Sequence, residues 1–445
     1  MPYLRPRHLI ALRCLLGLGF ALFALPTNGQ RTGFNPALPL THVDNGPNSQ
    51  WAQDQHYLVL VSLDGFRWDY AKRDHAMHLL AIGKAGVWAP EGMMPGYPSL
   101  TFPNHYTIAT GLYPEHHGIV ANSFLDPARG ARYSMSDPQA VTDGSWYGGV
   151  PLWSLAESHG MRTACLLWVG CEAKIAGFRP SYYATFDSKT QGTREAEQAR
   201  IDDTITLLHL PAADRPHLIL IYLSEPDHQG HEFGPDAPET RAAVLRMDAL
   251  VGRLRDALRT TGLPIDLVVV SDHGMTKSEG GWINLGDFAD LSGFETVGDL
   301  LYGKTEEDRA RVYNQLKHAT SQFMAFRRKD VPADLDYNQN PREGDPVIVA
   351  TGPHAIRAHA PRAGDSDRPP TIGMHGFDPH LVPEMKASFF AVGPDLREGK
   401  TVAPFDNVNL YPWMAHLLGL TPPKNDGSLN ILSGTLRDNG VAPVK

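Results

Sequence analysis

Cysteine is scarce in this chain of 445 residues, which contains only three. Cys14 is the first residue of an amino-terminal apolar run and would be removed with it, so Cys165 and Cys171 are the only possible disulfide pair of the mature chain. These two can close one small loop in an oxidising compartment. We expect instead two buried free thiols, on and after a strand, and assign no metal site to them.

A long apolar run is also missing. The run from Cys14 to Leu25 has twelve residues, whereas a helix needs about 20 to span a bilayer, so we expect no stable transmembrane anchor. Three arginines precede this run, and a proline follows it. The pattern is typical of a secretory signal peptide over residues 1–29, so we expect a periplasmic or secreted protein.

The sequence lacks both a basic stripe and an N-x-S/T acceptor site for N-glycosylation. It has 40 lysines and arginines against 49 aspartates and glutamates, and its formal charge of −9 becomes −12 once the three arginines of residues 1–29 are removed. Tight binding of duplex nucleic acid depends on basic side chains that neutralise phosphates, so we do not expect it. The missing acceptor site is compatible with a periplasmic protein.

Short apolar runs alternate with helical patterns along the chain. Such runs, bounded by turn residues, are typical of buried parallel strands, and the alternation predicts an α/β fold with a mostly parallel central sheet flanked by helices. The predicted strands are 57–63, 163–169, 217–223, 266–271 and 387–392. The predicted helices are 71–84, 193–208, 237–261 and 408–418.

The rest of the chain suggests one large catalytic domain at 56–434. An irregular lead-in is expected at 30–55 and a loose tail at 435–445, since both lack apolar periodicity. From 279 to 371 the pattern is looser, with a helix predicted at 306–325 and an apolar run at 347–351. We interpret 279–371 as an inserted subdomain that either roofs the site or is structural decoration.

What the chain does have is a set of carboxylates and imidazoles in four places. Asp64 and Asp272 directly follow two predicted strands, and Asp227 lies just after a third. In open α/β sheets, sites gather at the carboxyl ends of strands, so we expect these residues to meet. Three carboxylates and three imidazoles suit a two-zinc centre, which would keep one net positive charge to attract phosphate. The candidate ligands are Asp64, Asp227, His231, Asp272, His273 and His375.

Local spacing supports each pair of ligands. Asp227 and His231 are four residues apart, which places both side chains on one face of a helical turn. Asp272 and His273 are adjacent, and the glycine after them lets the turn bring both toward one ion. Glycines also stand on both sides of His375. Three other histidines near the motifs could shape the site, but we interpret them as structural: His105, His116 and His117.

Thr101 stands among these residues in the segment PSLTFPNH. Pro98 and Pro103 stiffen the chain around it, and residues 105–110 look like the start of a helix. A threonine at a helix amino terminus benefits from free N–H groups and the positive end of the dipole, which favour an alkoxide and a phosphate. Alternatively, Thr101 is simply a helix cap. Spacing alone leaves both interpretations open.

Six motifs occur together in the chain: LDGFRWDY, PSLTFPNHYTIATGLYPEHHGIVAN, WVGCEA, EPDHQGHEFGP, SDHGM and GMHGF. In this order they closely resemble the nucleotide pyrophosphatase/phosphodiesterases of the alkaline phosphatase superfamily, and the resemblance runs from about His56 to Gly419. It implies an alkaline-phosphatase-like fold and zinc-dependent cleavage of phosphodiester and pyrophosphate bonds of nucleotides. The product released would be a nucleoside monophosphate.

The resemblance also implies roles for individual residues. One zinc ion would be held by Asp227, His231 and His375, and the other by Asp64, Asp272 and His273. Thr101, bound to the second zinc, would attack phosphorus to form a phosphothreonine that water then hydrolyses. Asn122 and the Thr101 backbone N–H would hydrogen-bond a phosphoryl oxygen. The base would lie between aromatic residues, Phe102 and Tyr183, although core packing explains Tyr183 equally well.

Several rivals follow from the same motifs. Many relatives have W-P-G-S/T-E where this chain has Trp168 to Glu172 with valine and cysteine inside, which affects substrate preference and not metal binding. A phosphate monoesterase would need a cation there, and none is present, although Arg67 is available from elsewhere. A lipid-headgroup (choline-type) phosphodiesterase is the runner-up. An exported zinc-binding protein without catalysis is the alternative from another class.

Overall fold

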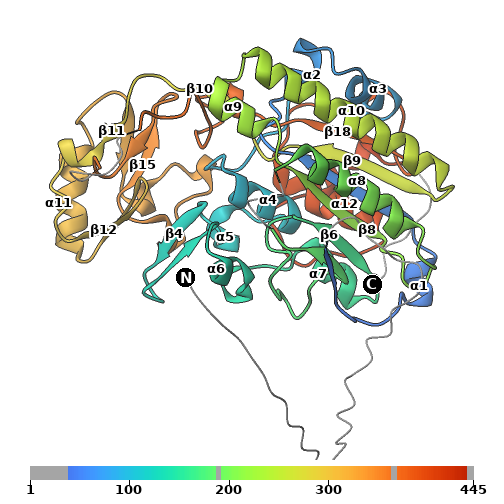
Figure 1. The fold of residues 1–445 in the computed structure, drawn as a ribbon. Helices are drawn as coiled ribbons and strands as arrows, with labels where there is room; N and C mark the ends of the chain where they lie inside the picture. The colour runs from blue at the N-terminus through green and yellow to red at the C-terminus, as the bar shows by residue number, and fades with distance from the viewer. Residues whose placement is uncertain (1–38, 187–191, 362–367, 438–445) are drawn as a thin grey trace, which may run out of the picture. The chain divides into compact units, whose positions relative to one another are not determined.

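The computed structural model describes residues 39–186, 192–361 and 368–437. The predicted signal peptide at 1–29 and most of the predicted tail at 435–445 lie outside this part of the chain. Within it, the centre of the fold is a nine-stranded mixed sheet flanked by helices, in the order β1-β7-β6-β8-β2-β9-β18-β3-β19 (Figure 1).

The middle of this sheet is parallel, as predicted. Its five strands are β7 (Tyr182–Ala184), β6 (Thr163–Leu166), β8 (Leu218–Leu223), β2 (Tyr57–Leu63) and β9 (Ile265–Val270). Four of them were predicted from the sequence, whereas β7 was not. All seven residues of β2 are buried, which explains its unbroken apolar sequence, because helices cover both faces of a parallel sheet. The prediction of a mostly parallel α/β fold is confirmed for this centre.

The sheet edges depart from the prediction. The outer strands are β1 (Leu40–His42), β18 (Phe389–Val392), β3 (Val87–Trp88) and β19 (Lys400–Thr401). The strand predicted at 387–392 is β18, which runs antiparallel to β9 and not parallel. Residues 40–53, expected to be irregular, include β1, paired antiparallel with β7, and a short helix, α1 (Gln50–Gln53). Short strands of this kind are formed by pairing with a partner, which their own sequence does not show.

Most predicted helices are present within a few residues. They are α8 (Arg194–Leu208), α10 (Pro238–Thr260) and α12 (Leu410–Leu417). The helix predicted at 71–84 is instead two helices, α2 (Tyr70–Arg73) and α3 (Met77–Ala85), because His75 between them has a left-handed φ of 60°.

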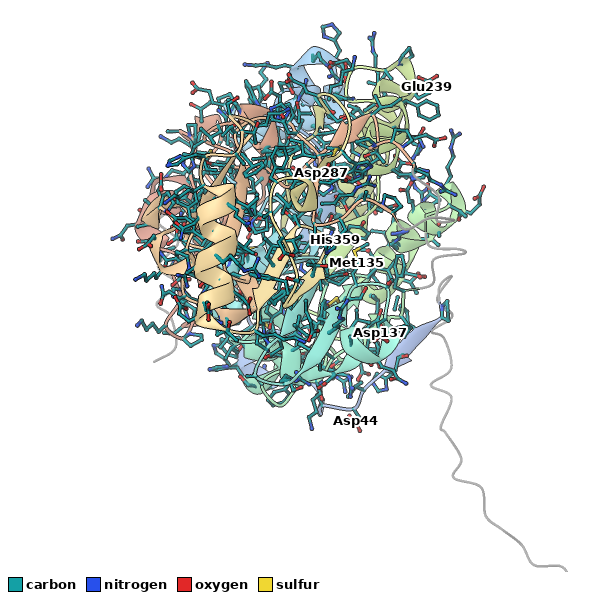
Figure 2. The ribbon with its side chains drawn as sticks, turned by 90° about the vertical axis from the view of Figure 1, so that its left-hand side faces the viewer. Asp44, Met135, Asp137, Glu239, Asp287 and His359 are labelled. Atoms are coloured by element: carbon teal, nitrogen blue, oxygen red, sulfur yellow. A yellow bond between two sulfur atoms is a disulfide. The ribbon has the colours of Figure 1, made fainter. Side chains whose placement is uncertain are left out.

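Part of the predicted insertion has its own hydrophobic cluster, which includes Leu301, Val312, Leu316 and Ile348. The helix predicted at 306–325 ends early, as α11 (Glu306–Leu316). Residues that follow it form β14 (Phe323–Phe326), in which burial alternates, and β14 pairs with β15 (Val347–Ala350). Figure 2 turns this side of the molecule toward the viewer, with Asp287 and His359 of the insertion labelled.

The register of the central strands places their carboxyl ends at one edge of the sheet. Leu63 of β2 lies beside Leu223 of β8, and Ser62 lies beside Val270 of β9. The residues that directly follow these three strands therefore begin at the same level. This edge is where Asp64 and Asp272 emerge.

Cys165 and Cys171 form a disulfide, with their Cα atoms 6.3 Å apart, so the expectation of two free thiols is wrong. Cys165 lies in β6, one residue before the strand ends. The chain then turns back at Leu167 and Gly170, which have left-handed φ values of 73° and 88°. This reversal brings the second cysteine beside the first. The apolar sequence of the strand alone does not indicate such a turn.

We predict that a Cys165→Ala, Cys171→Ala double variant loses roughly 2 kcal/mol of unfolding free energy, since a short cross-link restricts the unfolded chain. Urea denaturation monitored by fluorescence measures this loss. Wild-type protein in reductant should lose most of the same stability. When the mature chain is denatured without reductant, a thiol assay should detect neither cysteine. Detection of two free thiols would contradict the disulfide.

Candidate active site and metal centre

The predicted ligands meet at the carboxyl edge of the central sheet. Asp64 directly follows β2, and Asp272 and His273 follow β9. Asp227 and His231 are carried by α9 (Asp227–Phe233), which begins shortly after β8 and confirms the predicted helical turn. His375 comes from the loop after β17 (Gly373–Met374), which pairs with β10 (Thr276–Lys277). Four chain segments thus supply one site.

Asp227, His231 and His375 converge as the first set of ligands. The Nε2 atom of His231 lies 3.4 Å from Asp227 Oδ2, and the Nε2 atom of His375 lies 3.6 Å from Asp227 Oδ1. The two Nε2 atoms are 3.1 Å apart. One ligand atom from each residue falls within 4.8 Å of the others, a spacing that can hold one metal ion.

Asp64, Asp272 and His273 lie beside this set. The Nε2 atom of His273 is 3.0 Å from Asp272 Oδ2 and 3.5 Å from Asp64 Oδ1. The group within 4.8 Å that could hold an ion here contains Asp64, His273 and also Asp227, so Asp227 lies between the two sets. The rings of His273 and His375 stack with their centroids 3.6 Å apart. The two sets are therefore direct neighbours.

All three imidazoles are oriented in the same way. Each Nδ1 lies within hydrogen-bond distance of a backbone carbonyl oxygen, at 2.8, 2.9 and 3.0 Å for His231, His273 and His375. A ring that donates through Nδ1 keeps the lone pair of Nε2 available for a metal. The carbonyl partners are those of Gly373, Gly274 and Ser99.

The carboxylates carry oxygens that protein groups leave unsatisfied. Asp64 Oδ1, Asp227 Oδ1 and Asp272 Oδ2 are buried and accept no hydrogen bond from the described residues. Buried polar atoms without a partner are costly, and a cation is the partner that anionic oxygens at this edge would accept. The donor set therefore fits two metal ions with oxygen and nitrogen ligands.

Charge crowding supports the same conclusion. Burial, and then the carboxylates of Asp272 and Asp227, raise the pKa of Asp64 well above its usual value. Burial, and then the imidazoles of His273 and His231, lower the pKa of His375 well below its usual value. Both shifts arise from placing like groups together in a dry environment. Divalent cations would relieve this repulsion.

Thr101 is the first residue of α4 (Thr101–Thr110), and the cap position is Leu100, so Thr101 is not the helix cap. Its hydroxyl oxygen lies 3.3 Å from Nε2 of His273. Asn122 touches the same helix end, because its Oδ1 accepts a hydrogen bond of 3.0 Å from the Phe102 backbone N–H. The structure therefore brings Thr101 and Asn122 together beside the second ligand set.

Two supporting residues were not among the predicted site residues. His105, interpreted as structural, is fully buried, with Nδ1 2.8 Å from the Thr101 carbonyl oxygen, Nε2 2.8 Å from Ser62 Oγ, and Asp272 Oδ2 3.3 Å away. Tyr222 donates from its hydroxyl to Asp64 Oδ2 at 2.6 Å. The only signal for Tyr222 is a phenol inside the otherwise aliphatic strand LILIYL.

Other predicted residues lie apart from the ligands. Phe102 and Tyr183 are half-buried, and both pack against the main hydrophobic core. Phe102 lies edge-on to Tyr133, with ring centroids 6.4 Å apart. His116 and His117 bond to Asp426 and Thr107, away from the ligands. Their interpretation as structural histidines agrees with these contacts.

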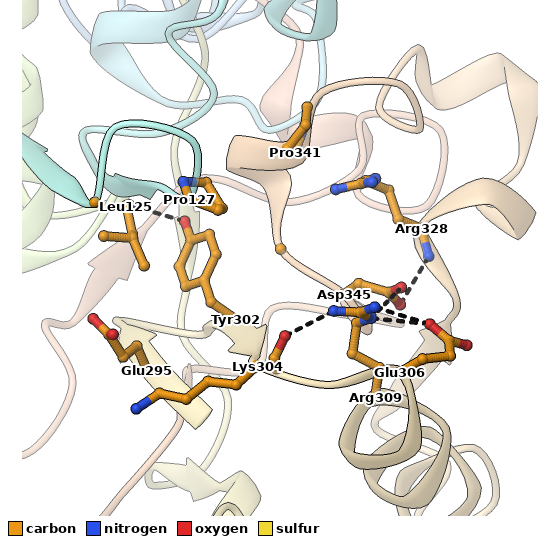
Figure 3. A pocket seen from close by; sticks show the side chains of 13 residues that line it. Leu125, Pro127, Glu295, Tyr302, Lys304, Glu306, Arg309, Arg328, Pro341 and Asp345 are labelled. Atoms are coloured by element: carbon orange, nitrogen blue, oxygen red, sulfur yellow. Dashed lines mark hydrogen bonds and ion pairs between the residues drawn. The ribbon is translucent and has the colours of Figure 1, made fainter. Parts of the chain in front are cut away.

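A pocket of about 570 Å³ on the insertion is not the site (Figure 3). Its lining contains none of the predicted site residues. Arg309 in this pocket is bound by Glu306 and by the Gly303 carbonyl. Arg67, the other cation considered for phosphate, is bound to Asp69 at 2.6 and 3.0 Å. Neither arginine is available as a free phosphate ligand.

Comparison with known proteins agrees with this geometry. The profile of the family described as Type I phosphodiesterase / nucleotide pyrophosphatase matches residues 58–378. An uncharacterized pyrophosphatase/phosphodiesterase of Schizosaccharomyces pombe is 33% identical over 84% of this chain and 79% of its own length. Rat ectonucleotide pyrophosphatase/phosphodiesterase family member 7 is 31% identical over 89% of this chain and 90% of its own length.

The chain belongs to this family. Its reaction class is the hydrolysis of phosphodiester and pyrophosphate bonds of nucleotides, so the predicted family and enzyme class are confirmed. The fold agrees with the structure of an inactive variant of murine ectonucleotide pyrophosphatase/phosphodiesterase 5 in complex with AMP. That likeness has a TM-score of 0.78 at 28% identity and covers 86% of this chain and all of that chain. Human family member 1, 31% identical over 86% of this chain, is matched over only 42% of its own length.

Among the helices that the structure describes, none has the length and apolar composition needed to cross a membrane. The longest, α10, has 23 residues, but its face toward solvent is charged. It packs against α3, α8 and α9.

We predict that Tyr222→Phe weakens metal binding roughly tenfold, because Asp64 would lose the hydrogen bond that orients it. Competition with a chromogenic chelator measures the affinity. Tyr411→Phe is the matched control, since Tyr411 is also buried and donates one hydrogen bond, to the Val150 carbonyl, away from the ligands. Equal metal affinity in the two variants would contradict the role of Tyr222.

Proposed function

We propose that this protein hydrolyses nucleotide phosphodiester and pyrophosphate bonds with two zinc ions, through a phosphothreonine formed on Thr101, and releases a nucleoside monophosphate. One observation carries the proposal. The Thr101 hydroxyl stands at the amino terminus of a ten-residue helix, 3.3 Å from the Nε2 atom of His273 and next to two adjoining sets of metal ligands.

The two ligand sets would each hold one ion. Asp227, His231 and His375 would hold the first. Asp64 and His273, with Asp272 beside them, would hold the second. When bound, zinc supplies Lewis-acid charge that polarises a phosphoryl oxygen and favours the ionised threonine hydroxyl. Zinc suits ligands of this kind, although the donor chemistry also accepts related divalent ions.

The protein groups around Thr101 position the substrate. The Thr101 oxygen attacks phosphorus as the bond from phosphorus to the leaving oxygen breaks, and water then cleaves the phosphothreonine. Backbone N–H groups in the first turn of α4 and the positive end of its dipole favour the phosphoryl oxygens. Asn122, held against the same turn by the Phe102 N–H, would offer its amide nitrogen to one of those oxygens.

Phe102 and Tyr183 would bind the base. Both rings are half-buried and keep exposed surface on which a base can stack. Stacking accepts several bases, so a broad nucleotide preference follows. The AMP complex of murine family member 5 supports a nucleotide as the ligand of this site.

Export of the protein agrees with two observations. The Cys165–Cys171 disulfide is of the kind that persists in oxidising compartments. Relatives such as rat family member 7 are named ectonucleotide enzymes. A periplasmic or secreted location, reached through the predicted signal peptide, is therefore part of the proposal.

We predict that Thr101→Ala lowers kcat for thymidine 5′-monophosphate p-nitrophenyl ester by a factor on the order of 10³ or more, because no other group forms the covalent intermediate. The variant should still bind two zinc ions, measured by elemental analysis. Thr107→Ala, on the same helix but bonded to His117, is the control and should keep most activity. Full activity of Thr101→Ala would exclude the nucleophile role.

Metal removal gives a second test. Dialysis against a strong chelator should abolish turnover, and two equivalents of zinc should restore it, because the unsatisfied carboxylate oxygens need cations. Titration with zinc, followed by activity and by calorimetry, measures the stoichiometry. Restoration by one equivalent, or turnover in the chelated protein, would contradict the two-metal proposal. An exported zinc-binding protein without catalysis would bind both ions and show no turnover.

A further inference from the structure

A second, smaller pocket lies directly beside the metal ligands. Its volume is about 210 Å³, less than the ~300–1,000 Å³ typical of drug-sized ligands, so it suits a small group. Its lining combines His375 and Leu100 with residues of the insertion, including Asp299 and Glu343. Neither Phe102 nor Tyr183 is in its lining. The pocket is therefore separate from the proposed base site.

The lining of this pocket contains carboxyl groups but neither lysine nor arginine. Glu343 is 0% exposed, and one of its oxygens accepts the Asn340 backbone N–H at 3.2 Å. The other oxygen, Oε2, is buried and has no hydrogen-bond partner among the described residues. Burial is also the main reason that the pKa of Glu343 is raised to about 8.

Asp299 adds a second carboxyl. It lies in the turn between β12 (Phe294–Val297) and β13 (Leu300–Gly303) and keeps access to solvent. The protein atoms around it nevertheless raise the pKa of its carboxyl to about 6. Among the residues that the structure describes, no lysine, arginine or histidine forms an ion pair with Asp299. Arg328, which acts on Glu343 from nearby, lines the other pocket (Figure 3).

Aromatic rings complete the wall. Tyr97 and Tyr337 both line the pocket, and their rings meet edge to face with centroids 5.1 Å apart. Both hydroxyls are directed to backbone carbonyls, those of Ile348 and Val120, at 3.3 and 3.0 Å. What remains toward the pocket is ring surface, which attracts cations and apolar groups. Trp282 is also present, although Arg357 already lies over its ring.

The position of the pocket points to the leaving group. In an in-line displacement the leaving oxygen departs from the side of phosphorus opposite the nucleophile. Thr101 lies against His273 of one ligand set, whereas the pocket is lined by His375 of the other. A group that leaves on the side of His375 would enter this pocket. This step rests on the proposed function.

We propose that this pocket is the leaving-group subsite and that it selects alcohols without negative charge, binding amine-bearing alcohols best, over polyphosphates. Ionised carboxyls favour a cation and oppose an anion, and the lining offers an anion two histidines, His354 and His375, but neither lysine nor arginine. The family reaction would thus be directed in this protein toward phosphodiesters with a neutral or cationic leaving group.

The test compares two aryl esters of thymidine 5′-monophosphate with similar leaving-group acidity. One carries a para trimethylammonium group and the other a para sulfonate. In the zinc-loaded enzyme at about pH 9, where both carboxyls are ionised, kcat/KM should be roughly tenfold or more higher for the ammonium ester. Asp299→Asn and Glu343→Gln should each reduce this ratio several-fold. Glu295→Gln, an equal charge change in the same hairpin but outside this pocket, should leave the ratio unchanged.

A binding measurement on metal-free protein gives a readout independent of turnover. Phenyltrimethylammonium should bind saturably, by calorimetry, and more weakly to Asp299→Asn, whereas benzenesulfonate should not bind. Equal kcat/KM for the two esters, or tighter binding of the sulfonate, would overturn the subsite while leaving the proposed function intact. If protein with both ions bound cleaves neither ester, the proposed function fails. In that case the binding of phenyltrimethylammonium and benzenesulfonate alone decides whether the pocket prefers cations.

Discussion

Three carboxylates and three imidazoles are crowded at one sheet edge, and the repulsion between like groups there is the constraint on which the surrounding structure depends. Asp64 and Asp272 are almost fully excluded from solvent, and three carboxylate oxygens there have no hydrogen-bond donor. In the absence of cations, this crowding raises the pKa of Asp64 and lowers the pKa of His375, so that both groups favour their neutral forms. If the proposed two cations bind, the same groups would become their ligands, and folding and metal binding would be coupled.

Rigid neighbours hold these groups in place against that repulsion. Backbone carbonyls fix the three imidazoles, the Tyr222 hydroxyl fixes Asp64, and His105 ties the start of α4 to Ser62 of β2. Because α4 begins at Thr101, the same bonds set the position of the proposed nucleophile. The parallel register of β2, β8 and β9 makes this possible by ending the three strands at one level.

The insertion has a different role. The candidate ligands come from the strand ends of the central sheet, from α9 and from the loop after β17, whereas the insertion supplies Asp299, Glu343 and Tyr337 to the lining of the small pocket. In our proposals, chemistry and selectivity are therefore carried by different parts of the chain. An insertion can change in sequence without disturbing the strand ends, which explains how one reaction class can serve different substrates.

Hydrophobic periodicity and motif spacing were sufficient to predict four of the five central parallel strands, most long helices and the ligand-bearing strand ends, because these depend on residues close together in sequence. The antiparallel direction of β18, the strand β1, the Cys165–Cys171 disulfide and the early end of α11 were decided by tertiary pairing. Tertiary structure also decided the contacts of Tyr222 and His105. Tyr222 bonds to Asp64, 158 positions away in the sequence, and His105 bonds to Ser62, 43 positions away. Glu343 and His375 line one pocket only because the folded insertion returns to the sheet edge. The sequence by itself determined which residues can bind metal, and the tertiary structure decided what surrounds them, since contacts between distant segments leave no local pattern.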